Sequence, residues 1–192
     1  MQQIAPYSQS FSTVNKRTRI LPHMTDWPSG ATSGEYDLAQ ICERGHIITA
    51  FADTQPGLRA SRCSKCGSVV IEKCPDCQAP LRGAFYGTYS VQMLTEAPKY
   101  CHQCGAAYPW RAEQLRMAEE LAAEAQYDLD EKEQGQLRDS LVEISTDTAA
   151  TQLAGARIKR LLNKVSEPLK AAIYKYAVDV SSEIGKKILT GE

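Results

Sequence analysis

The sequence lacks the features that define several large protein classes. No apolar run approaches the roughly 20 residues that a helix needs to cross a bilayer. The N-terminus has no charged start followed by an apolar stretch, so we expect no secretory signal. A formal net charge of −1 over 192 residues argues against a protein that coats a polyanion.

Recognisable catalytic arrangements are also missing. The chain has no Ser-His-Asp order, no glycine-rich phosphate loop and no His-Glu-x-x-His helix. No Cys-x-x-Cys pair stands at a helix start after a βαβ pattern, where a redox pair belongs. The carboxylates are plentiful, but they have the spacing of solvated helix faces. We therefore expect a protein that is not an enzyme.

Every cysteine belongs to a close pair, and this pattern organises the chain. Two residues two to four positions apart can bend round one ion, and structural zinc takes four thiolate or imidazole ligands. Seven cysteines and one histidine give eight ligands, which is enough for two zinc ions with no cysteine left over. The predicted metal ligands are Cys42, His46, Cys63, Cys66, Cys74, Cys77, Cys101 and Cys104.

Paired Cys-x-x-Cys in a reducing compartment indicates metal binding before disulfide formation. We therefore expect a cytoplasmic protein with two bound zinc ions. The segment that carries the pairs is too short for a large core of its own. Metal binding replaces core burial in such domains, contributing on the order of 10–16 kcal/mol for each structural site.

The eight ligands allow two groupings. In the sequential arrangement the first two pairs share one ion and the last two share the other. In the cross-brace arrangement of RING domains, pairs one and three share an ion, as do pairs two and four. The histidine in the first pair and the short spacer 67–73 favour the sequential arrangement. His102 lies inside a complete pair and His23 has no partner at ligand spacing, so neither is expected to be a ligand.

Composition divides the chain into three parts. Residues 1–34 are rich in Ser, Thr, Gln and Pro and are expected to form an irregular leader, or one that docks through its few apolar side chains. Residues 36–108 are predicted to form a double zinc-ribbon domain, with short hairpin strands near 47–49, 69–71 and 85–89. Gly45, Gly67 and Gly105 stand where a left-handed turn would aim amides at the thiolates.

Residues 109–192 have helical composition, and their apolar spacing predicts about four helices. The first begins at Pro109 and runs to about 127, and the second spans about 132–145. Thr146 and Asp147 are expected to cap the third, and the fourth covers about 168–189. Residues 109–147 are mainly acidic and residues 148–192 mainly basic, which indicates packed or solvated faces of opposite sign. The fold class is thus small α+β: two zinc ribbons followed by an all-α region.

Two stretches carry a resemblance. The run from Tyr36 to Ile48, together with Cys-Gly-Ala-Ala-Tyr-Pro-Trp ending at Trp110, resembles a family of uncharacterised bacterial double-zinc-ribbon proteins with a C-terminal helical tail. The resemblance implies metal ligands at the eight positions named, a prokaryotic cytoplasmic setting and no established activity. The segment 177–189 looks like a terminal helix shared by several such proteins and suggests a link to bacterial defence.

Two functions are compatible with this architecture. The first is a non-enzymatic interaction or adaptor protein, in which the ribbons form a rigid recognition module and the helical tail docks on a partner or self-associates. The second is a nucleic-acid-binding regulator, in which basic residues near the central knuckles contact phosphates and Phe85, Tyr86 and Tyr89 stack bases. The basic residues are Arg59, Arg62, Lys65, Lys73 and Arg82. Their charge is nearly balanced by acids in the same region, so we favour the first function.

Overall fold

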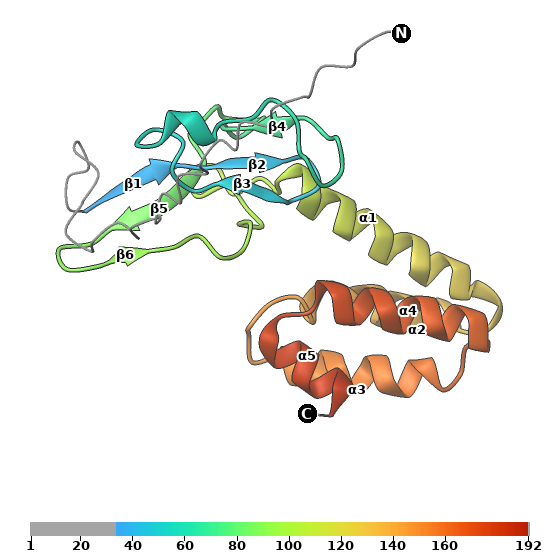
Figure 1. Cartoon of the computed structure of the whole chain (residues 1–192). Coiled ribbons are helices and arrows are strands. Elements are labelled where there is room, and N and C mark those ends of the chain that lie inside the picture. Colours follow the sequence, from blue (N-terminus) through green and yellow to red (C-terminus); the bar gives the residue numbers. More distant parts are fainter. Residues whose placement is uncertain (1–33, 192) are drawn as a thin grey trace, which may run out of the picture.

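The computed structural model describes residues 34–191, so the expected leader at 1–33 lies outside the described residues. Figure 1 shows a strand-rich half and a helical half, with helix α1 extending from one to the other. The fold is α+β, with short antiparallel strands in the first half and five α-helices in the second. No helix in the described part is both long and apolar enough to cross a membrane.

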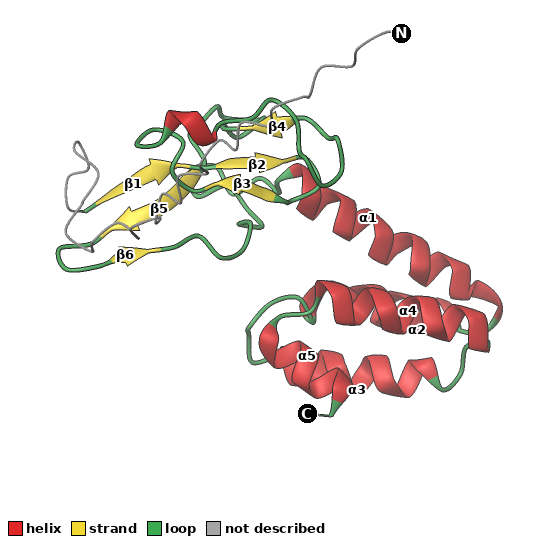
Figure 2. Ribbon diagram, in the orientation of Figure 1, coloured by secondary structure: helices red, strands yellow, loops and turns green. Residues whose placement is uncertain are grey.

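Two three-stranded antiparallel sheets form the first half (Figure 2). One has the order β1-β5-β6 and the other the order β3-β2-β4. Strands β1 and β2 follow each other almost directly, so a single extended segment joins the two sheets. The bounds are β1 Glu35–Leu38, β2 Gln40–Cys42, β3 Ile47–Thr49, β4 Val70–Ile71, β5 Arg82–Tyr86 and β6 Val91–Gln92.

The expected strands at 47–49 and 69–71 are confirmed within one residue, but the third was misplaced. Strand β5 ends at Tyr86, because Gly87 begins a tight turn in which its amide donates to the Ser90 carbonyl at 2.8 Å. Sequence analysis assigned no strand to residues 35–42. Strands this short have too few residues to show a clear alternation of apolar and polar side chains. Strands β1 and β2 are instead defined by their pairing with the distant strands β5 and β4.

The helical half contains one more helix than predicted. Its elements are α1 Pro109–Glu124, α2 Glu131–Glu143, α3 Thr151–Leu162, α4 Glu167–Val180 and α5 Glu183–Thr190. The predicted helix over 168–189 is wrong, because it breaks at Ser181, which has extended backbone angles. Ser182 then caps α5 by accepting a hydrogen bond from the Gly185 amide.

The start of α3 also differs from the prediction. The helix begins at Thr151, and neither Thr146 nor Asp147 is its N-cap. The Thr151 hydroxyl instead donates to the Thr146 carbonyl and accepts from the Thr148 amide. These local hydrogen bonds fold residues 146–150 into a loop. The helix therefore begins about one helical turn later in the chain than predicted.

The helical core is built from the predicted apolar stripes. Its fully buried members include Leu137 and Leu141 of α2, Ile158 and Leu161 of α3, and Ile173 of α4. Helix α5 approaches α2 and α3 closely because both contact positions are glycine. A Cβ at Gly155 would overlap Ile188, and a Cβ at Gly185 would overlap the carbonyl oxygen of Ile144.

Candidate metal centres

The first cluster lies at the end of the sheet β3-β2-β4. Cys42 ends β2, a turn through Gly45 follows, and His46 stands directly before β3. The Nδ1 atom of His46 is 3.5 Å from the Cys42 Sγ and 3.6 Å from the Cys63 Sγ. The Sγ atoms of Cys42 and Cys66 are 3.8 Å apart. Four potential ligand atoms therefore surround one point, with Nδ1 as the histidine atom that faces it.

The second cluster consists of four cysteines from the turns before β5 and before α1. The Sγ atoms of Cys74 and Cys104 are 3.8 Å apart, and those of Cys77 and Cys101 are 3.6 Å apart. In each cluster all four ligand atoms lie within 4.8 Å of one another. The grouping is the sequential one, because the first two pairs share one cluster and the last two pairs share the other.

Each of the four turns contains one left-handed residue, which precedes the second ligand in the first turn and follows it in the other three. Gly45, Gly67 and Gly105 have φ angles of 84°, 72° and 76°, as their positions predicted. The third turn has Gln78 at this point with a φ of 61°, the one left-handed non-glycine residue among those described. Its amide donates to the Cys74 carbonyl at 3.0 Å, as the Gly67 amide does to that of Cys63 at 2.8 Å.

Backbone and side-chain donors point at the sulfur atoms and stabilise negative charge on them. The Ser68 hydroxyl and amide lower the pKa of the Cys66 thiol to about 6. The amides of Cys104 and Gln103 lower the pKa of the Cys101 thiol to about 6 as well. The thiolate is the form that binds metal, so these donors favour metal binding at neutral pH.

The two clusters differ in exposure. In the first, Cys42 and Cys63 are buried, while Cys66 and His46 are half-buried. In the second, Cys74 and Cys101 are buried, but Cys77 and Cys104 are exposed. A stacked aromatic pair, Tyr108 and Trp110, belongs to the same buried core as Cys74 and Cys101, with ring centroids 4.9 Å apart.

The donor set fits zinc. Soft thiolates with at most one imidazole, four to a site and close enough for a tetrahedron, are the ligands of structural zinc. The residues that would hold the ions are the eight predicted from the sequence. His102 is exposed and belongs to neither cluster, as expected. His23 lies outside the described residues.

A family model described as an uncharacterized protein conserved in bacteria, DUF2321, matches residues 35–189. This match covers both clusters and all five helices except the last residue of α5. The chain belongs to the DUF2321 family. No curated protein and no solved structure matches the chain. The family assignment agrees with the resemblance found in the sequence, and the two clusters are consistent with a double zinc ribbon.

Two of the residues considered for nucleic-acid contact, Tyr86 and Arg59, are engaged within the chain. Tyr86 is buried, and its hydroxyl donates to the Asp37 carboxylate at 2.8 Å, so its ring cannot stack on a base. The Arg59 guanidinium pairs with Asp53 at 3.0 Å and with Glu72 at 3.4 Å. Tyr89 is almost fully exposed in the turn between β5 and β6. Phe85 and Arg82 lie beside Tyr36, a residue outside the predicted set. The remaining candidates, Arg62, Lys65 and Lys73, are exposed.

Proposed function

We propose that this protein is a non-enzymatic, zinc-binding interaction protein that presents the strand-rich half to a partner as a rigid recognition surface. Support comes first from the clusters. Each offers four protein ligands, the full complement of a structural zinc ion, whereas catalytic zinc keeps a position for water or substrate. Two such ions would hold two small sheets in a fixed shape without a large core.

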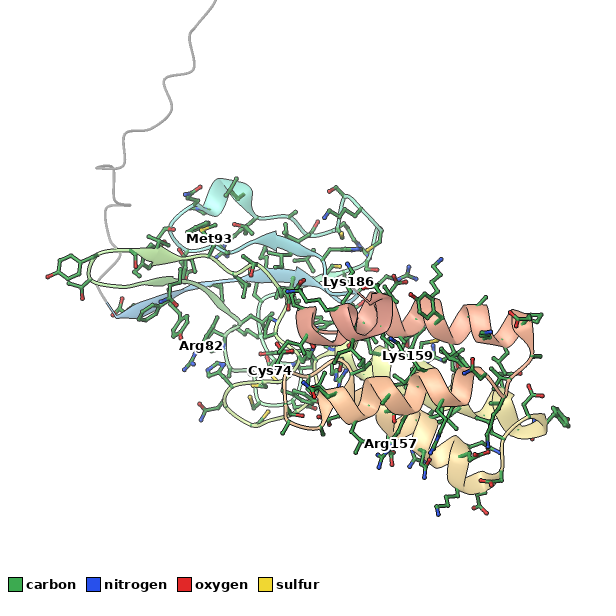
Figure 3. The ribbon with its side chains drawn as sticks, turned by 90° about the horizontal axis from the view of Figure 1, so that it is seen from below. Cys74, Arg82, Met93, Arg157, Lys159 and Lys186 are labelled. Carbon is green, nitrogen blue, oxygen red and sulfur yellow. The ribbon has the colours of Figure 1, made fainter. Side chains whose placement is uncertain are left out.

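The observation that carries the proposal is an exposed aromatic group on the sheet β1-β5-β6. Tyr36 is 49 % exposed, although it lies in a strand. Its ring centroid is 4.8 Å from that of Phe85, and the Arg82 guanidinium carbon lies 4.6 Å from the Tyr36 centroid. Figure 3 shows Arg82 on the strand-rich half, away from the helices. Exposed Tyr and Arg side chains are the types most enriched at the centres of protein interfaces.

The support beneath this aromatic group is rigid. Asp37, the neighbour of Tyr36, points to the opposite face and is buried. Its carboxylate accepts hydrogen bonds from the hydroxyls of Thr54 and Tyr86 and from the amides of Leu38 and Asp53. A partner that binds Tyr36 would therefore meet a surface that needs little ordering, which favours affinity.

The helical half has a smaller part in this proposal. The apolar face of α4 is covered within the chain, since Ile173 and Ala177 are fully buried against the other helices. Self-association through that face is therefore not needed to cover it. Opposite charges of the two helical stretches also meet within the chain, where Lys164 pairs with Glu133.

The test compares two exposed tyrosines in quantitative affinity capture from a bacterial lysate, with the zinc-loaded full chain as bait. Tyr36→Ser removes the centre of the aromatic group. Tyr127→Ser is the matched control, because Tyr127 is 91 % exposed on the helical half. We expect the captured proteins to be lost with Tyr36→Ser and kept with Tyr127→Ser. Equal capture by both variants would contradict the proposal.

A role in prokaryotic defence is part of the proposal and rests on the resemblance of the terminal helix. The measurement is the plating efficiency of a phage panel on a host strain with the gene, without it, and with the Tyr36→Ser variant. Protection that requires Tyr36 supports the role. Identical plating on all three strains argues against it.

A further inference from the structure

A cleft of about 1530 Å³ lies between the first metal cluster and the helical half. Gly45, His46 and Trp110 contribute to one wall, and residues 145–147 and 179–183 form the other. Lys99, Tyr100 and Ser145 also line it. Its walls come from segments far apart in the chain, so no sequence motif marks it. The adaptor role proposed above makes no use of this cleft.

A buried arginine without a carboxylate partner stands directly behind the cleft wall. Arg111, in the first turn of α1, is 1 % exposed. Its Nε donates to the Tyr100 hydroxyl at 3.2 Å, and its Nη1 donates to the Ser145 hydroxyl at 2.9 Å and to the Gln114 side-chain oxygen at 3.3 Å. All three acceptors are neutral residues that line the cleft. The Nη2 atom is buried and has no hydrogen-bond partner among residues 34–191.

A second unpaired cation lies beside the first. The Lys99 ammonium donates to the carbonyl of Ser145, the residue whose hydroxyl receives Arg111. Glu96 and Asp147 are near enough to act on Lys99 through their charge, but neither forms an ion pair with it in the described part of the chain. Two like charges are thus held close together in a partly desolvated place.

The group has more hydrogen-bond donors than acceptors. The Arg111 Nη2 carries two N–H groups, the Lys99 ammonium has two beyond the one given to Ser145, and the Tyr100 hydroxyl accepts from Arg111 while its own proton has no acceptor within 34–191. Of these donors only the Arg111 Nη2 is fully buried, whereas Lys99 is half-buried and Tyr100 is 44 % exposed, and both line the cleft. Buried donors are normally satisfied, and buried charges normally paired. The missing component is therefore an acceptor with negative charge, and an oxyanion supplies both.

The rest of the cleft limits what else the ligand can carry. Six carboxylates line it against three cations, Arg44, Lys65 and Lys99. Among the six, only Glu113 forms an ion pair within the described residues, and the others are Glu43, Glu96, Asp147, Asp179 and Glu183. These carboxylates would repel a polyanion such as nucleic acid. We propose that the cleft binds one oxyanion group, a carboxylate or a phosphomonoester, on an otherwise neutral or cationic ligand. Lys99 and Tyr100 are its direct donors, and Arg111 is the buried charge behind them.

The test uses Trp110, which lines the cleft and whose indole N–H donates to the Pro98 carbonyl at 2.8 Å. The sequence has two tryptophans, so Trp27→Phe leaves Trp110 as the sole tryptophan, whose fluorescence can be excited selectively over that of the tyrosines. The zinc-loaded full chain is titrated with inorganic phosphate and, separately, with acetate, at an ionic strength held constant with chloride. We expect a saturable fluorescence change that Lys99→Met weakens about tenfold or more, since it removes a charged donor.

Lys65→Met is the matched control, because Lys65 also lines the cleft but has no contact with Arg111 or Ser145 in the structure. If both lysine variants weaken anion binding equally, the effect is one of general charge and the proposal is overturned. The proposal is also overturned if neither anion gives a saturable change in the parent protein. Saturation by phosphate alone identifies a phosphomonoester ligand, whereas saturation by both anions means that a carboxylate is accepted. If Lys99→Met fails to fold, amide chemical shifts of residues 99, 100 and 145 in the parent protein give the same decision.

Discussion

Replacing Asp37 with asparagine tests whether a buried carboxylate joins the parts of the strand-rich half. Asp37 is 4 % exposed and accepts four hydrogen bonds. The amides of Leu38 and Asp53 donate to its Oδ1 at 2.7 Å and 2.9 Å. The hydroxyls of Thr54 and Tyr86 donate to its Oδ2. These partners come from β1, from the loop after β3 and from β5, so one side chain links three segments.

The expected loss follows from what asparagine can keep. Its carbonyl oxygen can still accept from both amides, but its NH₂ group faces two hydroxyls that must rotate from donating to accepting. The variant can therefore keep four hydrogen bonds at residue 37, but none of them involves a charged group. Hydrogen bonds to charged groups are about twice as strong as neutral ones, so we expect a loss of about 2–3 kcal/mol. This corresponds to roughly 30–150-fold faster exchange of protected amides.

The assay is amide hydrogen exchange at pH 7 on the zinc-loaded protein. The reporters are the Ala84 amide, which donates to the Ala50 carbonyl, and the Ala52 amide, which donates to that of Leu38, both at 2.9 Å. Asp53→Asn is the control, because the Asp53 side chain is 64 % exposed and its pair with Arg59 contributes little. Unchanged exchange in Asp37→Asn, or an equal effect of Asp53→Asn, would refute the reasoning.

The difference in stability between the wild type and Asp37→Asn should depend on pH. Burial alone would raise the pKa of Asp37, but hydrogen bonds from Thr54, Tyr86, Asp53 and Leu38 lower it overall. Because the pKa of Asp37 is lower in the folded state, its contribution to the free energy of unfolding is complete above the unfolded-state pKa of about 3.9. That contribution is lost as the pH falls through the folded-state pKa. The stability difference between wild type and Asp37→Asn should therefore shrink in acid. Acid also protonates the metal ligands of both proteins, so the difference is the quantity to measure.

Three further outcomes follow from the clusters and the helix contacts. Elemental analysis should give two zinc ions per chain, and one ion, or iron in its place, would contradict the eight-ligand assignment. Cys101→Ser should reduce the ratio to one and leave amide signals around Cys63 unchanged, because the clusters share no ligand. Gly185→Ala should destabilise the helical half by about 1–3 kcal/mol in thermal melts, since the new methyl overlaps the Ile144 carbonyl. Gly135→Ala in α2 is the control, because its new methyl group has no atom of another residue within contact distance. It should stabilise the helical half by about 0.5–1 kcal/mol, and a loss of stability in this control would contradict the steric explanation of Gly185→Ala.

Local chemistry in the sequence was enough to find the clusters and most of the helices. Ligand spacing is set by the reach of two side chains in one turn, so the four pairs were visible as pairs. Gly67 and Gly105 marked left-handed turns because only glycine adopts them at no steric cost. Gln78 adopts the same left-handed conformation, but glutamine does not mark such a turn in a sequence. The left-handed turn after the third cysteine pair was therefore not predicted. The helices α1 and α2 followed from apolar spacing and end within a few residues of the prediction.

Contacts between distant segments decided the rest, because their energies depend on neighbours that one stretch of sequence does not contain. Strands β1 and β2 are held by pairing with β5 and β4, and the break at Ser181 lets Gly185 reach Ile144. The burial of Tyr86 depends on Asp37, 49 positions earlier. Arg111 and Lys99 meet at Ser145 only because α2 packs against α1 and returns the chain to the start of α1. The sequence by itself thus determined which residues can bind metal and where helices form, whereas tertiary packing determined which side chains are exposed and which charges remain unpaired.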